Sequence, residues 1–300
     1  MLHILDTRHL GQPGIIGVIA LETNHGIALF DAGADSTFET LSLEMRVAGF
    51  APDDVRHVFL SHIHLDHAGA AWHFAEMGAT IHVHPIGANH LIDPSRLIES
   101  ATRIFGSDMH RLWGEMRPIA KKQVHPTNDS IPVRLGEFEI RSIATPGHAS
   151  HHNVYQWDDN LFGGDVAGVR LDGGPPVPPF VPPELQIESW LDSIARMRAL
   201  FVRRLYLPHF GLVEGDLAAH FDALAERVER WANWFRDQLR LGRNEAELVR
   251  DFAAYEAKDI VDSGAPKERL ADYEHADPSF MAVTASVRYW QKFHPEALVL

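Results

Sequence analysis

The sequence contains no cysteine, so it can form neither a disulfide framework nor a cysteine-ligated metal site. No uninterrupted apolar stretch approaches the ~20 residues of a membrane-spanning helix, and the N-terminal residues show no basic or long apolar segment typical of a secretory signal. Positive charge is scarce, because 27 Lys and Arg stand against 41 Asp and Glu and give a formal net charge of -14. We therefore expect a cytoplasmic protein that binds neither nucleic acid nor a membrane.

The remaining composition is that of a folded globular protein. Hydrophobic residues make up 45% of the 300 positions and charged residues 23%. This length allows one large domain or two modest ones, each with a sizeable core.

The turn after the apolar run Val58–Leu60 holds three histidines and an aspartate within six positions. In extended backbone His62 and His64 point the same way, so both imidazoles can reach one ion. Asp66 and His67 are adjacent at the expected start of a helix, so they diverge from that pair and could reach a second ion. Imidazole and carboxylate ligands suit zinc, iron, manganese or nickel. The turn therefore predicts a metal-binding loop.

A His-x-His-x-Asp-His turn at the end of a strand resembles the metallo-β-lactamase superfamily. That family's pattern continues with a histidine, then an acidic residue or cysteine, then a last histidine, each after its own strand. The chain supplies these three in order, in Thr145-Pro146-Gly147-His148, Phe162-Gly163-Gly164-Asp165 and Leu207-Pro208-His209. The resemblance covers roughly residues 1–215.

The resemblance implies an α/β fold, a metallo-β-lactamase-type αββα sandwich in which two mixed β-sheets are flanked by helices. We expect residues 1–215 to form this metal-binding domain. Apolar residues at helical spacing predict further helices over 216–241, 245–257 and 278–290. Residues 216–300 are therefore expected to form a C-terminal helical extension packed on the metal-binding domain.

Carried over residue by residue, the resemblance also implies a set of metal ligands. One metal would be held by His62, His64 and His148, the other by Asp66, His67 and His209, and Asp165 would bridge them. Two divalent cations, zinc foremost with iron or manganese as alternatives, can share a hydroxide that acts as a nucleophile at neutral pH. Asp66 could also accept the proton that this nucleophile sheds, which makes it the expected catalytic residue.

This site predicts a hydrolase that cleaves a thioester, a lactone or another ester of a small molecule, similar to glyoxalase II. A carboxylate at Asp165 departs from the β-lactam-cleaving branches that use a cysteine there, which argues against an antibiotic hydrolase. A mononuclear iron sulfur dioxygenase and a metal-stabilised binding protein without catalysis remain alternatives. The substrate and the oligomeric state, including a homo-oligomer, stay open.

Four further positions are candidates beyond the ligands. Asp31 ends a strand in Asp-Ala-Gly and is either a turn residue or, on the resemblance, the partner that orients a ligand histidine. His151 follows His148 too closely to be another ligand and is expected near the ligands or the substrate. Phe180, within the proline-rich stretch 173–183, is expected to offer apolar contact to a substrate. His82 lies on a strand and has either a structural role or a place in the pocket wall.

Overall fold

The computed structural model describes residues 1–299, and Leu300, the last residue of the expected extension, lies outside the described part. The chain forms two compact units. The first unit comprises Met1–Ala144, His151–Gly164 and Val202–Leu212, and the second comprises Thr145–Ser150, Asp165–Phe201 and Val213–Leu300. Each unit is built from several separate segments of the chain, whereas the expected division was a single boundary after residue 215. That expected boundary stays a prediction.

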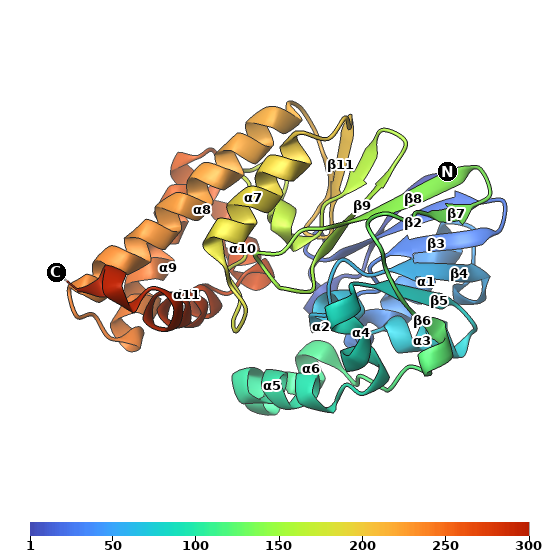
Figure 1. The fold of residues 1–300 in the computed structure, drawn as a ribbon, viewed down its shortest axis with the longest axis horizontal. Coiled ribbons are helices and arrows are strands. Elements are labelled where there is room, and N and C mark those ends of the chain that lie inside the picture. The colour runs from blue at the N-terminus through green and yellow to red at the C-terminus, as the bar shows by residue number, and fades with distance from the viewer. Residues whose placement is uncertain (300) are drawn as a thin grey trace. The chain divides into compact units, whose positions relative to one another are not determined.

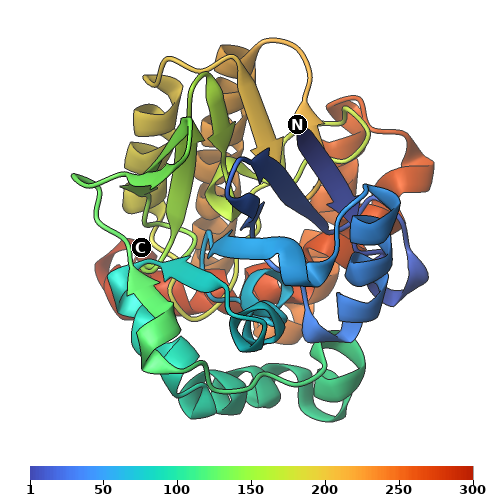
Figure 2. The same cartoon turned by 90° about the vertical axis from the view of Figure 1, so that its right-hand side faces the viewer.

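Two six-stranded mixed sheets dominate the first unit, coloured blue to teal and green to gold (Figures 1 and 2). In the first sheet β1 to β3 are antiparallel neighbours, and β3 to β6 run parallel. Its strands are β1 (Leu2–Asp6), β2 (Gly17–Thr23), β3 (Gly26–Phe30), β4 (Val55–Phe59), β5 (Thr80–Val83) and β6 (Val124–Pro126). The second sheet has the order β12-β11-β10-β9-β8-β7. Its strands are β7 (Val133–Leu135), β8 (Phe138–Ala144), β9 (Asn153–Trp157), β10 (Asn160–Phe162), β11 (Arg204–Leu207) and β12 (Gly211–Val213).

Aromatic side chains fill the space between the two sheets. Phe30 and Phe59 from the first sheet are buried with Trp157 and Phe162 from the second. The rings of Phe30 and Trp157 stack with their centroids 4.5 Å apart. Full burial of each such side chain contributes about 1.5–3 kcal/mol, so this layer fixes the two sheets against each other.

Helices of the first unit cover the other face of the first sheet. Val58 and Ile81 point to this face and pack in one core with Leu41 and Phe74. The helices are α1 (Phe38–Val47), α2 (Leu65–Ala68), α3 (Ala71–Glu76), α4 (Pro85–Ile92), α5 (Ser95–Phe105) and α6 (Met109–Trp113). Val58 and Phe59 of β4 are thus buried on opposite faces of the sheet, whereas Arg56 near the start of the strand is exposed.

The pattern after the metal loop predicts one helix up to Met77, but the structure forms α2 and α3 with a break at Gly69 and Ala70. The Ala70 backbone N–H donates to the Gly33 carbonyl at 2.9 Å instead of to its own helix. A Cβ atom on Gly69 would stand 3.2 Å from the Ala34 Cα atom. The close approach of this neighbouring loop therefore ends the helix.

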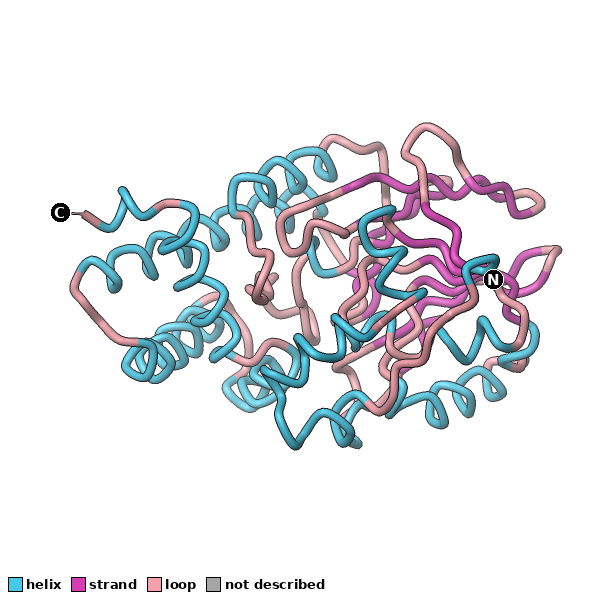
Figure 3. The backbone as a smooth tube through the Cα atoms, turned by 60° about the horizontal axis from the view of Figure 1, so that its bottom comes forward, coloured by secondary structure: helices cyan, strands magenta, loops and turns pink. Residues whose placement is uncertain are grey.

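The second unit is mainly helical, and the helices near the C-terminus are drawn in cyan in Figure 3. Its helices are α7 (Ile187–Arg198), α8 (Leu217–Arg240), α9 (Glu245–Asp262), α10 (Leu270–Ala276) and α11 (Ser279–Phe293). Asp216 accepts hydrogen bonds from the first N–H groups of α8, and Asn244 and Glu247 form a capping box at α9. The two mixed sheets, their flanking helices and the C-terminal helical region confirm the expected fold class. No helix within residues 1–299 has both the length and the apolar character to cross a membrane.

Charged side chains are buried among the helices of the second unit. Asp259 accepts hydrogen bonds from Arg227 at 2.7 Å and from Trp231 at 3.0 Å. Glu256 is only 5% exposed, and its Oε2 atom has no hydrogen-bond partner among the described residues. Burial raises the pKa of Glu256, and the neighbouring Asp277 carboxylate raises it further.

We expect the Glu256→Gln variant to lose less stability than the parent as the pH rises. A carboxyl with a raised pKa stabilises the fold below its unfolded pKa, and this contribution is lost as the pH rises through the folded value. Glutamine keeps the shape of the side chain without the charge. The difference in unfolding free energy, variant minus parent, should therefore be about 1–3 kcal/mol more favourable to the variant at pH 8 than at pH 5. Urea unfolding at both pH values measures this, and the exposed Glu229→Gln variant should follow the parent. Equal pH slopes for parent and Glu256→Gln would refute the assignment.

Candidate metal centre

The loop after β4 is held at its base by strands β3 and β9. Asp31, at the end of β3, donates its backbone N–H to the Phe59 carbonyl at 2.9 Å. From β9, the Tyr155 hydroxyl donates to the Leu60 carbonyl at 2.8 Å, and the Asn153 N–H donates to the Ser61 carbonyl at 2.7 Å. The loop is therefore fixed on the edge where parallel strands end, a usual place for functional side chains in α/β proteins.

His62 and His64 point their ring nitrogens toward one place. His62 Nε2 and His64 Nδ1 are 2.9 Å apart, the ring centroids 4.4 Å apart, and the ring planes at 81°. The His57 and His82 nitrogens are equally close at 3.0 Å, yet those centroids are 5.2 Å apart and the planes at 26°. Both contacts are within hydrogen-bond distance. The His62 and His64 nitrogens also lie close enough together for both to reach one ion.

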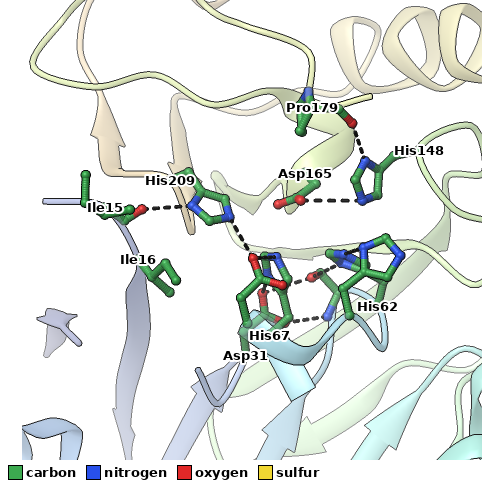
Figure 4. Close-up of polar contacts among 12 residues, drawn as sticks. Ile15, Ile16, Asp31, His62, His67, His148, Asp165, Pro179 and His209 are labelled. Atoms are coloured by element: carbon green, nitrogen blue, oxygen red, sulfur yellow. Dashed lines mark hydrogen bonds and ion pairs between the residues drawn. The ribbon is translucent and has the colours of Figure 1, made fainter. Parts of the chain in front are cut away.

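Asp66, His67 and His209 form a second group, in which one ligand atom of each lies within 4.8 Å of the others. The Asp66 Oδ2 atom is 3.2 Å from His67 Nε2 and 3.4 Å from His209 Nε2. All three belong to the first unit, and Figure 4 shows His67 and His209 with their outer partners. One carboxylate oxygen and two imidazole nitrogens are a common ligand set for zinc or iron.

Hydrogen bonds on the far side of each ring fix which nitrogen carries the proton. His67 Nδ1 donates to Asp31 Oδ2 at 2.7 Å, and His209 Nδ1 donates to the Ile15 carbonyl at 2.8 Å (Figure 4). The Nε2 atoms therefore keep their lone pairs on the side of Asp66, as metal ligands require. These partners show that the residues present fit a metal ion.

Asp31 is fully buried and holds more than the one ring. It accepts hydrogen bonds from the Ser61 N–H at 2.7 Å and from the Ser61 hydroxyl at 2.9 Å, besides the bond from His67. Burial raises the pKa of Asp31, while the His67 and Ser61 bonds oppose that rise. Its φ angle of 62° is left-handed, a conformation that aspartate tolerates better than most residues.

For Asp66 the effects on the pKa balance the other way. Burial works to raise its pKa, but His67 and His209 outweigh burial and hold the pKa of Asp66 well below its usual value. Asp66 is therefore a carboxylate at neutral pH, which is the form that binds cations.

The second unit holds His148 and Asp165. His148 Nδ1 donates to the Pro179 carbonyl at 2.8 Å, and its Nε2 atom is 3.5 Å from Asp165 Oδ2 (Figure 4). Trp190 of α7 fixes both segments, because its Nε1–H donates to the Val166 carbonyl and its backbone packs on Gly147. A Cβ atom on Gly147 would stand 2.3 Å from the Trp190 Cα atom, so only glycine fits before His148.

The seven expected ligands are thus distributed over the two units. The first unit brings together His62, His64, Asp66, His67 and His209, and the second brings together His148 and Asp165. One centre that uses all seven stays a prediction.

The other expected positions differ in their surroundings. The ring of His151 is buried, with its centroid 6.1 Å from that of His62, and its role at the ligands or the substrate stays a prediction. Phe180 is fully buried between Trp190 and Trp231, so its ring supports the second unit from within and offers no surface to a substrate. His82 has a structural role, because it bonds to His57 and stacks on a core phenylalanine.

One buried histidine near the second group was not anticipated. His9 is 2% exposed, and burial lowers its pKa, while the nearby Asp66 raises it and His209 lowers it. It stands in no recognisable motif, and only the folded chain brings it near these residues. No signal in the sequence could have identified it.

Comparisons with known proteins agree with this geometry. The family model described as the metallo-beta-lactamase superfamily matches residues 12–209. The metallo-beta-lactamase fold-containing protein ST1585 of Sulfurisphaera tokodaii is 27% identical over 217 residues, which cover 71% of this chain and 79% of that protein.

Solved structures share the fold. The crystal structure of ST1585 has a TM-score of 0.60 at 23% identity and covers 76% of this chain and 98% of its own. The family protein TTHA1429 from Thermus thermophilus has a TM-score of 0.66 at 19% identity, covering 97% and 93%. SMB-1, a metallo-beta-lactamase solved with 2-mercaptoethanesulfonate, has a TM-score of 0.57 at 19% identity and covers 76% of this chain and 92% of its own. Because the family model spans about two thirds of the chain and includes its histidine and aspartate turns, the chain belongs to the metallo-beta-lactamase superfamily.

Proposed function

We propose that the protein is a metal-dependent hydrolase that cleaves an ester-type bond of a small molecule: a thioester, a lactone or another ester. The observation that carries this proposal is the pair of outer hydrogen bonds from His67 and His209. They leave both Nε2 lone pairs beside the Asp66 carboxylate. With this arrangement both Nε2 atoms and the Asp66 carboxylate could bind the same cation.

The proposed centre contains two divalent cations, zinc foremost, with iron and manganese as alternatives. His62, His64 and His148 would hold one ion, Asp66, His67 and His209 the other, and Asp165 would bridge them. This assignment joins residues of both units and follows the family pattern. When bound, such ions lower the pKa of water to near 7 and stabilise negative charge on the carbonyl oxygen under attack.

The chain's own residues supply the remaining chemistry. The pKa of Asp66 is held well below its usual value, so Asp66 is an anion at neutral pH and would serve first as a cation ligand. Its role as acceptor of the nucleophile's proton is a separate part of the proposal. Asp31 and the Ile15 carbonyl keep His67 and His209 in the tautomer that binds cations. No serine or cysteine nucleophile is needed, and the chain contains no cysteine.

The partner in this proposal is a small-molecule substrate. With a formal net charge of -14, the chain is poorly suited to nucleic acid or to an anionic membrane, and neither is part of the proposal. Several proteins of similar fold are named metallo-beta-lactamases, at 14–22% identity. A β-lactam therefore belongs among the compounds tested, although the carboxylate at Asp165 argues against it.

We expect about two equivalents of metal per chain in protein purified without chelators or a metal-binding tag, measured by plasma mass spectrometry. The loaded protein should hydrolyse at least one member of a panel of thioesters, lactones and simple esters. The Asp66→Asn variant should lose about 100-fold or more of this activity, because it removes both a ligand and a proton acceptor. The exposed Asp53→Asn variant is the matched control and should keep the parent activity.

Other outcomes of this experiment separate the alternatives. One equivalent of iron with oxygen uptake on a persulfide would replace the proposal by a sulfur dioxygenase. Metal that raises the unfolding temperature, without turnover of any ester, persulfide or β-lactam, would indicate a metal-stabilised binding protein. Full activity in the Asp66→Asn variant would contradict the proposed chemistry.

A second prediction concerns Asp31→Asn. Asparagine tolerates the left-handed backbone at this position, so the loop should keep its shape. Its amide N–H groups would face His67 Nδ1 and favour the tautomer with the proton on Nε2, the nitrogen that should bind the ion. Zn²⁺ affinity should fall about 10- to 100-fold in a competition assay with a chromophoric chelator.

The matched control is Glu22→Gln, which alters a carboxylate that pairs with His3 at 2.6 Å. Its Zn²⁺ affinity should equal that of the parent. An unchanged affinity in Asp31→Asn would show that the His67 bond does not govern metal binding.

A further inference from the structure

The loop between β1 and β2 is closed by its own hydrogen bonds. The Thr7 N–H and hydroxyl donate to the Ile16 carbonyl at 3.0 and 2.9 Å. Asp6 accepts hydrogen bonds from the Arg8 N–H at 2.9 Å and the Gly14 N–H at 2.8 Å. Arg8 and Leu10 have φ angles of 48° and 52°. Left-handed conformations cost side-chain-bearing residues about 1 kcal/mol or more each, and they persist where the surroundings impose them.

His9 lies between these two strained residues, and its side chain is fixed on two sides. Its Nε2–H donates to the Leu112 carbonyl at 2.9 Å, which also accepts the Ser36 hydroxyl at 2.6 Å. The Trp113 ring stacks on the imidazole with centroids 5.1 Å apart and planes at 9°. Thr7 and Asp6 join the ends of the loop, and the two His9 contacts fix its strained middle.

The same loop leads directly to the second metal position of the first unit. Its Ile15 carbonyl accepts the Nδ1–H of His209, and Gly17 donates to the Pro208 carbonyl at 2.7 Å. The charges that act on His9 include those of Asp66 and His209, two of the three members of that group. The loop that carries His9 therefore holds one ligand candidate of this group in place.

We propose that His9 is a positioning residue for the Asp66, His67 and His209 metal position. Its bond to Leu112 and its stack on Trp113 hold the strained loop, so that the Ile15 carbonyl stays on His209 Nδ1. This inference rests on the proposed metal centre and adds a residue that acts through His209.

The test compares His9→Phe and His9→Asn with the parent. Phenylalanine keeps a ring against Trp113 but cannot bond to Leu112, whereas asparagine keeps a donor and loses the ring. With Zn²⁺ alone as probe, both variants should bind one of the two equivalents about 10- to 100-fold less tightly than the parent does and keep the other at the parent affinity. With Co²⁺ alone, the absorption bands of the weakened equivalent should change. Parent affinity and an unchanged spectrum in either variant would overturn the inference.

Two controls separate the outcomes. His25→Asn, an exposed histidine in the β2–β3 turn, should match the parent in affinity and spectrum. Ser36→Ala removes the other donor to the Leu112 carbonyl. It should lower the Zn²⁺ affinity of the same equivalent that the His9 variants weaken, and it serves as the test if those variants fail to fold. A parent that binds fewer than two equivalents would refute the proposed centre and this inference with it. A parent with two equivalents and unaltered His9 variants would refute the inference alone.

Discussion

The candidate ligands of the first unit depend on the buried carboxylate of Asp31. It accepts two hydrogen bonds from Ser61 and one from His67, so one side chain at the end of β3 fixes two points of the loop that follows β4. A carboxylate without water needs such donors, because an unpaired buried charge is strongly destabilising. Since the donors belong to the loop itself, the burial of Asp31 and the shape of the loop form a single constraint.

In the second unit, packing against Trp190 provides a comparable constraint. Its backbone leaves no room for a side chain at Gly147, and its indole N–H donates to the Val166 carbonyl at 2.8 Å. Its ring also meets that of His148 edge to face with centroids 5.6 Å apart. One helical residue therefore positions both the histidine turn and the aspartate turn of this unit. The first unit thus holds its candidate ligands with a buried carboxylate that accepts three hydrogen bonds, whereas the second unit holds its candidates by packing against an indole.

The sequence predicted the features that are encoded locally. Strand ends followed by His62 and His209, and the starts of α8 and α9, are legible because the residues that matter are neighbours in the chain. The features that it could not predict are set by distant segments. The break between α2 and α3 depends on a bond from Ala70 to Gly33, and the burial of Phe180 depends on two tryptophans from separate helices. The place of His9 likewise follows from a carbonyl on α6.

The buried carboxyl groups of this chain differ in charge because their surroundings shift their pKa values in opposite directions. Asp66 lies beside two imidazoles, and its pKa is well below the usual value, so it is an anion that can hold a cation. Burial and neighbouring acids raise the pKa of Glu256, which favours its protonated form. A protonated carboxyl attracts cations far less than an anion does. The excess of acidic residues therefore does not by itself mark metal sites in this chain. Asp66 fits one because the imidazoles of both His67 and His209 lie beside its carboxylate.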